Sequence, residues 1–324
     1  MRAVVLRAFG APECLRVEDV PEAIPGPGEV VVAVEFASIT FVETQVRAGR
    51  PPNPAMLPTL PVVPGNGVGG VVAAVGEGVD PSLGGRSVVS TTGGSGGYAE
   101  RVVVDAGELI DVPPGLALED AVALLADGRT AMGLTDVAAL RPGDTVLVEA
   151  AAGGVGSLLV QLARHAGASV VAAAGGTRKV ALASELGADV AVDYSDPAWA
   201  SRVRDEVGEL DVVFDGVGGA IGRDALELLG AHGRFVPYGM ASGAFTPMSD
   251  DEIARRQLTV ARFVPSGPDA MRTLTRRALT AAADGWLGPV VGQTFPLEGA
   301  ADAHAAIEAR TTVGKTLLVI DPST

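Results

Sequence analysis

Hydrophobic and polar positions change their spacing part-way along the chain. Up to about residue 120, apolar residues come in short stretches separated by glycine clusters, which predicts strands over residues 1–9, 29–36, 68–75, 86–90 and 98–104. The second of these stretches alternates, with Val30, Val32, Val34 and Phe36 on one face. Short strands at even spacing predict a β-barrel or a β-sandwich for this part of the chain.

From about residue 118 the pattern alternates between helices and strands. Helices are predicted over 119–125, 130–140, 179–186, 220–229 and 252–256, and strands over 144–148, 170–174, 190–193, 211–215, 234–238 and 258–263. Strands that alternate with helices are joined by right-handed crossovers and form a parallel sheet that is covered on both faces. The expected fold class is therefore α/β, with a doubly wound parallel sheet over residues 121–265.

The last segment, residues 266–324, predicts helices over 269–283 and 300–308 and strands over 290–295 and 316–320. It is too short to bury a core of its own. We expect it to return to residues 1–120 and complete that domain. A proline-rich loop over 51–64 is open to two interpretations, a stiff surface connection or one wall of a cleft.

A glycine-rich turn follows the strand at 144–148. Gly153, Gly154 and Gly156 precede a helical pattern at 157–163, and Ala151 takes the place of the first glycine of the dinucleotide fingerprint G-x-G-x-x-G. Without a β-carbon the backbone lets a phosphate approach, and the first amides of the helix then face that anion. We expect a pyrophosphate at Gly153, Gly154, Val155 and Gly156.

The end of the second strand indicates which dinucleotide binds. NAD sites place an acidic residue there, but here Ala174 is followed by Gly175, Gly176, Thr177, Arg178 and Lys179. A hydroxyl and two cations suit a 2′-phosphate, which favours NADPH over NADH, and Tyr194 is a further candidate to flank the pocket. The alternative is that Arg178 and Lys179 are ordinary solvated residues at a helix start.

Composition and charge narrow the class of protein. The 324 residues are 48% hydrophobic and 19% charged, which suits a folded core, and the net charge of −15 argues against nucleic acid or an anionic membrane as partner. The chain lacks an uncharged apolar run of membrane length and a signal-peptide profile at its start. A single cysteine, Cys14, fits a reducing compartment. We expect a soluble, cytoplasmic protein.

Metal ligands are scarce. Cys14, His165, His232 and His304 are not spaced like a metal cluster, and a catalytic zinc ion usually has at least three protein ligands. We therefore expect no metal site and a structural role for each histidine.

Taken together, these motifs resemble the zinc-free quinone oxidoreductases of the medium-chain dehydrogenase/reductase superfamily, over nearly the whole chain. The matching segments are residues 62–66, 75–79, 96–100, 129–131, 142–144, 150–156, 215–219, 295–297, 303–304 and 314–316. The resemblance implies a GroES-like β-barrel catalytic domain (1–120, completed by 266–324), a Rossmann NADPH-binding domain (121–265) and an active site in the cleft between them. It also implies a homodimer formed through the edge strand at 258–263.

The same resemblance suggests residues on the acceptor side of the site. Relatives commonly have asparagine where this chain has Thr40, aspartate at Glu43 and a tyrosine near residues 50–51. Thr40 still offers a hydroxyl donor and is the first candidate for an active-site contact. Glu43 and Arg47 are interpreted as a local ion pair that holds this segment. Asn66 either lines the cleft or only makes a turn.

Further candidates concern the cofactor. Thr130 matches a residue that contacts nicotinamide in relatives, or it caps a helix. Strand ends beside the nicotinamide are expected to provide Gly239, Met240, Phe263 and Val264, and Val217 lies in the matching segment 215–219. Lys315 either reaches the cofactor or is a surface lysine.

The expected function is that of an NADPH-dependent reductase that transfers a hydride to a quinone or similar conjugated carbonyl without a metal, with late protonation from water. Two alternatives remain open: a double-bond reductase for enones or enoyl thioesters, and a non-catalytic NADPH-binding sensor. The expected partners are a small-molecule acceptor and a second copy of the chain.

Overall fold

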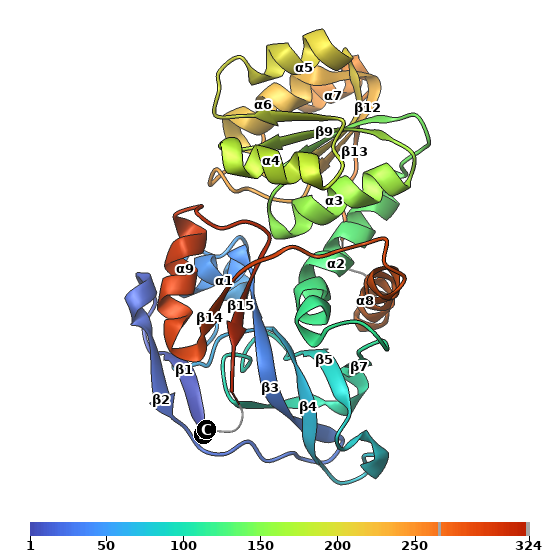
Figure 1. The fold of residues 1–324 in the computed structure, drawn as a ribbon. Coiled ribbons are helices and arrows are strands. Elements are labelled where there is room, and N and C mark those ends of the chain that lie inside the picture. The colour runs from blue at the N-terminus through green and yellow to red at the C-terminus, as the bar shows by residue number, and fades with distance from the viewer. Residues whose placement is uncertain (265–266, 322–324) are drawn as a thin grey trace. The chain divides into compact units, whose positions relative to one another are not determined.

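The computed structural model describes residues 1–264 and 267–321 (Figure 1). Its internal contacts divide the chain into unit 1, Met1–Ala126 with Thr275–Thr324, and unit 2, Asp127–Leu274. The domain limits expected from the sequence, near residues 120 and 265, stay a prediction, and the second of them falls at residues 265–266, outside the described part. No helix within residues 1–264 and 267–321 is long and apolar enough to cross a membrane.

Unit 2 is built on a six-stranded sheet in the order β10-β9-β8-β11-β12-β13, in which every pair of neighbours is parallel. The strands are β8 (Thr145–Glu149), β9 (Ser169–Ala174), β10 (Val190–Asp193), β11 (Leu210–Asp215), β12 (Leu229–Pro237) and β13 (Thr259–Val260). The chain starts in the middle of the sheet, winds to one edge and then returns to the other. This confirms the doubly wound α/β arrangement expected from the alternating pattern.

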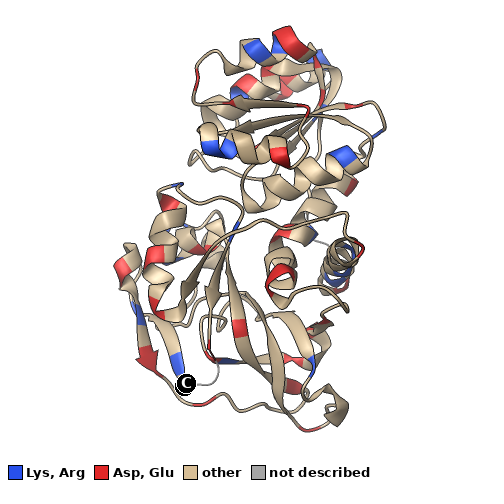
Figure 2. Cartoon of the chain, in the orientation of Figure 1, with Lys and Arg blue, Asp and Glu red and all other residues tan. Residues whose placement is uncertain are grey.

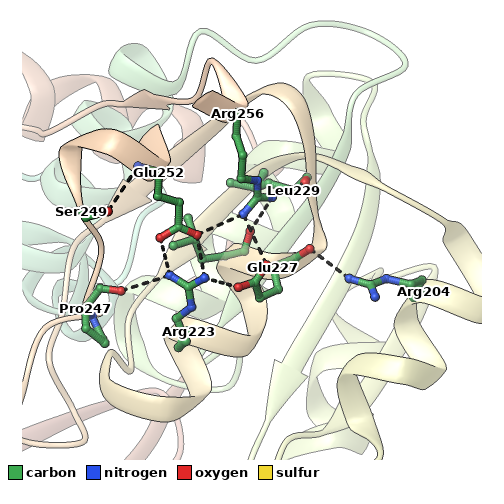
Figure 3. A network of polar contacts seen from close by, with 9 residues as sticks. Arg204, Arg223, Glu227, Leu229, Pro247, Ser249, Glu252 and Arg256 are labelled. Carbon is green, nitrogen blue, oxygen red and sulfur yellow. Dashed lines mark hydrogen bonds and ion pairs between the residues drawn. The ribbon is translucent and has the colours of Figure 1, made fainter. Parts of the chain in front are cut away.

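Helices cover both faces of this sheet (Figure 1). One face carries α3 (Gly154–His165) and α4 (Thr177–Glu185), and the other carries α5 (Trp199–Val207), α6 (Gly219–Leu228) and α7 (Asp250–Arg256). Trp199, Phe214 and Phe235 are buried between the layers. Figure 3 shows how α6 and α7 are joined at their outer side: Arg223 donates to both Glu252 oxygens at 2.6 Å and also pairs with Glu227.

Two sequence predictions in this region were wrong in extent. The helices expected over 119–125 and 130–140 form one continuous helix, α2 (Leu118–Ala138), because a single interior glycine, here buried Gly128, costs a helix only about 1 kcal/mol. Thr130 therefore lies in the helix interior and does not cap a helix. The strand expected over 258–263 pairs only at Thr259 and Val260, and α5 was missed.

Unit 1 is rich in strands, as expected. A hairpin of β1 (Arg2–Leu6) and β2 (Leu15–Asp19) lies beside a seven-stranded sheet in the order β14-β15-β3-β4-β5-β7, with β6 also paired to β3. The strands of this sheet are β3 (Glu29–Ile39), β4 (Gly67–Val75), β5 (Ser87–Thr91), β6 (Arg101–Asp105), β7 (Ile110–Asp111), β14 (Val291–Pro296) and β15 (Lys315–Val319). Because β15 pairs antiparallel with β3, the end of the chain shares one sheet with its beginning.

Three helices complete the described chain in and near unit 1: α1 (Phe41–Arg47), α8 (Pro268–Ala283) and α9 (Ala300–Glu308). The core of unit 1 combines residues from both ends of the sequence, among them Val32 of β3, Tyr98, Ala303 of α9 and Leu318 of β15. Three elements were not predicted: β2, β7 and the seven-residue helix α1, whose start is fixed by side chains.

Candidate functional site

The glycine turn lies at the carboxyl end of β8, where the fingerprint predicted it. Ala150 adopts a left-handed conformation (φ 49°), and the Gly153 N–H donates to the Ala150 carbonyl at 2.8 Å to close the turn. Gly153 is the N-cap of α3 and provides no side-chain cap. A β-carbon on Gly156 would lie 2.2 Å from the Ala150 carbonyl oxygen, so only glycine fits there. The turn is a bare backbone cradle at a helix N-terminus, which fits the pyrophosphate of a dinucleotide.

A second group of predicted residues gathers where β9 leads into α4. Gly176 is the N-cap of α4, with φ at 89°, and its N–H donates to the Asp193 carboxylate at 3.0 Å. The Tyr194 ring packs against Gly175. Thr177 and Arg178 are exposed and Lys179 is half-buried. Figure 2 shows basic positions in the first turn of α4. The structure therefore brings a hydroxyl, two cations and an aromatic ring together at one strand edge.

The remaining unit 2 candidates lie at the carboxyl ends of β11 and β12. Val217 is buried, and the Gly239 N–H donates to the Asp215 carbonyl at 3.2 Å, so the loops after these two strands are in contact. Met240 follows Gly239 directly. The Phe263 ring instead packs against Gly133 of α2, and Val264 is 73% exposed. Phe263 and Val264 follow β13 in the chain.

One residue of this edge was not among the predicted site residues: Glu149, the last residue of β8. Its side chain is fully buried and accepts a hydrogen bond from the Val217 N–H at 3.1 Å. Burial, followed by the charge of Asp215, raises the pKa of Glu149 well above its usual value. The signal was an acidic residue at the end of an apolar strand, directly before the glycine turn.

In unit 1, Thr40 caps α1. Its side-chain oxygen accepts from the Glu43 N–H at 3.3 Å, while its own N–H and hydroxyl donate to Glu43 Oε2 at 2.6 and 2.9 Å. This is a capping box, in which Thr40 is the N-cap and Glu43 is the third residue of the helix. The Thr40 hydroxyl hydrogen is therefore directed at Glu43.

The expected ion pair between Glu43 and Arg47 was wrong. Glu43 accepts from Thr40 and, at 2.9 Å, from the Asn66 N–H. Arg47, 2% exposed, donates instead to the Gly10 carbonyl and to Glu308 of α9. The two residues are one helical turn apart, but each has a hydrogen-bond partner from another segment of the chain.

Lys315 is only 3% exposed, so its interpretation as a surface lysine was wrong. Its positive charge acts on Glu43: burial raises the pKa of Glu43, while the hydrogen bonds from Thr40 and the charge of Lys315 oppose that rise. The Asn66 side chain accepts from the Gly94 N–H at 2.7 Å, which fixes its turn. Unit 1 thus gathers Thr40, Glu43, Asn66 and Lys315 around one carboxyl group, whereas Thr130 belongs to unit 2.

The potential metal ligands are scattered. Buried His304 makes a hydrogen bond with the Tyr98 hydroxyl at 3.2 Å, and burial together with the charge of Arg47 lowers its pKa to about 3. His165 ends α3, and His232 is exposed in β12. Within the described ranges 1–264 and 267–321, no three His, Cys, Asp or Glu side chains are grouped to hold a metal ion.

Each of the two units matches a family model built from known proteins. The family model described as "Alcohol dehydrogenase GroES-like domain" matches residues 26–114, and the one described as "Zinc-binding dehydrogenase" matches residues 154–280. A GroES-like domain together with a Rossmann domain defines the medium-chain dehydrogenase/reductase class of oxidoreductases.

Individual relatives narrow this class. The chain is 33% identical to a 2-haloacrylate reductase of a Burkholderia species, covering 98% of both chains. It is 31% identical to a quinone oxidoreductase of Pseudomonas aeruginosa, covering 98% of this chain and 99% of the relative. The solved Escherichia coli quinone oxidoreductase complexed with NADPH superposes with a TM-score of 0.88 at 28% identity, over 98% of this chain and all of the other. This chain belongs to the quinone oxidoreductase family of the medium-chain dehydrogenase/reductase superfamily.

Proposed function

We propose that this protein is an NADPH-dependent reductase that transfers a hydride to a quinone or a similar conjugated carbonyl without a bound metal. The observation that carries this proposal is the bare cradle at Gly156, together with the two cations Arg178 and Lys179 in the first turn of α4, a turn that contains no acidic residue. Relatives described as a quinone oxidoreductase and as an NADPH complex support both the acceptor and the cofactor.

Different groups of residues bind the pyrophosphate, the 2′-phosphate and the nicotinamide of the cofactor. The backbone of Gly153, Gly154, Val155 and Gly156 binds the pyrophosphate at the positive end of the α3 dipole. The 2′-phosphate is held by Thr177, Arg178 and Lys179, with Tyr194 against Gly175 as the wall of that pocket. The nicotinamide end is assigned to Val217, Gly239, Met240, Phe263, Val264 and Lys315. When bound, NADPH supplies the hydride.

Thr40, Asn66 and Thr130 are the residues proposed for the acceptor side. Because the Thr40 hydroxyl donates to Glu43, the role assigned to it is to hold the start of α1 and the Asn66 turn around that carboxyl group. Developing negative charge on the acceptor oxygen is then stabilised by the site's dipoles and by buried Lys315, and the proton comes from water.

Independence from metal is part of the proposal. Two observations support it. His304 is hydrogen-bonded to Tyr98, and burial raises the pKa of the half-buried Cys14 thiol, which disfavours the thiolate that a metal ion needs. Activity should be unchanged after dialysis against a chelator, with a metal content below one ion per ten chains. A loss of activity restored by zinc would contradict this part.

The direct test is oxidation of NADPH with a panel of quinones, enones, enoyl thioesters and a 2-haloacrylate. Turnover with quinones at the highest kcat/KM supports the proposal. Preference for an enone or thioester would move the protein to the double-bond reductases, and binding without turnover would indicate a sensor. The ratio of kcat/KM for NADPH and NADH should favour NADPH, since Lys179 and Arg178 pair with a phosphate that NADH lacks.

Two further points belong to the proposal. A homodimer formed through β13, which lies at the open edge of the unit 2 sheet, should give twice the chain mass by light scattering. A cytoplasmic location, supported by the single cysteine, is checked by cell fractionation. No nucleic acid or membrane partner is proposed, because the net charge is −15.

A further inference from the structure

Two buried carboxyl groups lie side by side at the carboxyl edge of the unit 2 sheet. Glu149 ends β8 and Asp215 ends β11, and both side chains are 0% exposed. Because Val148 is paired with Phe214, Glu149 and Asp215 occupy the next positions of adjacent parallel strands. The Val217 N–H donates to Glu149 Oε2 and to Asp215 Oδ1, at 3.1 Å from each. The two carboxyl groups therefore share one donor.

The remaining donors are unevenly divided between them. Asp215 also accepts from the Gly218 N–H at 2.6 Å and from the Thr246 hydroxyl at 2.6 Å, which suits a carboxylate. Glu149 Oε1 is buried and has no hydrogen-bond donor among the residues that the structure describes. A proton on Glu149 removes one of two like charges and allows a hydrogen bond to Asp215, which two carboxylates could not make.

The surrounding groups favour this proton. Burial raises the pKa of Glu149, and the negative charges of Asp215 and, from α6, Asp224 raise it further. The Tyr238 hydroxyl, at the end of β12, donates to the Glu149 carbonyl at 2.7 Å. The pKa of Tyr238 is itself raised, by burial first and then by Glu149, Asp215, Tyr194 and Asp127, so Tyr238 stays neutral.

We propose that Glu149 carries a proton at neutral pH and acts as a positioning residue for NADPH, by tying the glycine turn after β8 to the loop Gly216–Gly219 after β11. The inference rests on the proposed function and assigns to the cofactor site a residue outside the fingerprint. Glu149 directly precedes Ala150, where the turn begins, and its shared donor is the amide of Val217. Loss of the proton would leave two adjacent buried carboxylates and force the loop away from the turn.

The proton can be tested without cofactor. In the unfolded chain a glutamate loses its proton near about pH 4.3, whereas in the folded protein Glu149 keeps it. The stability gained from this proton is therefore complete below about pH 4.3 and falls as pH rises towards the folded pKa. In Glu149→Gln the amide donates to Asp215 at every pH and has no proton to lose.

The measurement is urea unfolding of wild type and Glu149→Gln between about pH 5 and pH 8, with Glu206→Gln, at an exposed position of α5, as the matched control. The ratio of the wild-type unfolding constant to that of Glu149→Gln should rise about tenfold per pH unit. The ratio of the wild-type unfolding constant to that of Glu206→Gln should not change with pH. A ratio that is also flat for Glu149→Gln overturns the proposal.

The positioning role is tested by the Kd for NADPH at neutral pH. Glu149→Gln should stay within about threefold of wild type, whereas Glu149→Leu, which has neither an acceptor for the Val217 N–H nor a donor to Asp215, should bind about tenfold more weakly or worse. Equal affinity of the leucine variant, or an equal loss in both, overturns this role. Should the leucine variant not fold, the Kd for NADPH is measured at rising pH instead. The affinity of wild type must then fall more steeply with pH than that of Glu149→Gln. If wild type does not bind NADPH, the proposed function fails, while the unfolding ratio still tests the proton.

Discussion

The glycine turn before α3 and the Thr40 segment before α1 are two helix starts built in opposite ways. Gly153 caps α3 without a side-chain hydrogen bond, whereas Thr40 and Glu43 satisfy each other's backbone amides at the start of α1. An open start leaves amides and the positive dipole end for a ligand, and a closed start uses them within the chain. Of these two segments, only the turn after β8 is therefore suited to an anion.

The comparison extends to how each region is stabilised. The glycine turn depends on close backbone approach, with Gly156 against the Ala150 carbonyl. The Thr40 segment depends on side chains from distant parts of the sequence, Arg47 with Glu308 and Glu43 with the Asn66 amide. Substitutions should therefore affect binding in the first region and mainly stability in the second.

The largest effect is expected for Arg47→Met. Arg47 is 2% exposed and joins α1 to Glu308 and to the Gly10 carbonyl, so its removal leaves two half-buried acceptors without this donor. We expect a loss of about 3 kcal/mol in the free energy of unfolding, measured with urea. The exposed neighbour Arg50 provides the control: Arg50→Met should cost less than about 0.5 kcal/mol. Similar values for both would mean that the side-chain network does not hold α1.

Next comes Gly156→Ala. The added methyl group would lie 2.2 Å from the Ala150 carbonyl oxygen, so the turn must shift, at a cost of about 2 kcal/mol in stability. NADPH affinity measured by calorimetry should fall about tenfold or more. Gly153→Ala is the control for stability, because its β-carbon would lie 3.2 Å from the same oxygen. If Gly156→Ala binds NADPH like wild type, the cradle has been misassigned.

Lys179→Ala sharpens the cofactor assignment. Loss of a charge-assisted contact with the 2′-phosphate should raise the KM for NADPH roughly tenfold, which corresponds to about 1.5 kcal/mol, and leave the KM for NADH nearly unchanged. Arg202→Ala, which removes an exposed cation of α5 paired with Asp196, controls for net charge. An equal change for both cofactors would remove Lys179 from the phosphate pocket.

The smallest effect is expected for Thr40→Val, which keeps the shape and removes the capping hydroxyl. Stability should fall by about 1 kcal/mol, and Thr40→Ser should restore it. Because the hydroxyl donates to Glu43, kcat should change less than about threefold at saturating quinone. A far larger fall in kcat, not rescued by serine, would make Thr40 a direct contact of the acceptor.

Features that depend on local backbone chemistry could be predicted from the order of residues alone. The doubly wound order followed from the alternation of strands and helices, and the glycine turn was found because only glycine allows such a close approach at Gly156. The absence of an acid after β9 was equally visible. Local propensity went wrong at α2, where two helices were predicted over 119–125 and 130–140 but one continuous helix runs through buried Gly128.

The partners of the charged side chains, in contrast, depend on how distant segments fold together. Arg47 contacts residues 37 and 261 positions away, Lys315 is buried beside Glu43, and Glu149 meets Asp215 because β8 and β11 are neighbours in the sheet. A buried charged group loses its hydration and must be compensated by hydrogen bonds or an opposite charge. Which group provides them depends on which strands and helices are neighbours in the fold. Sequence spacing predicts possible partners within one helical turn. Burial and the order of the strands determine which partner a charged side chain contacts in the folded protein.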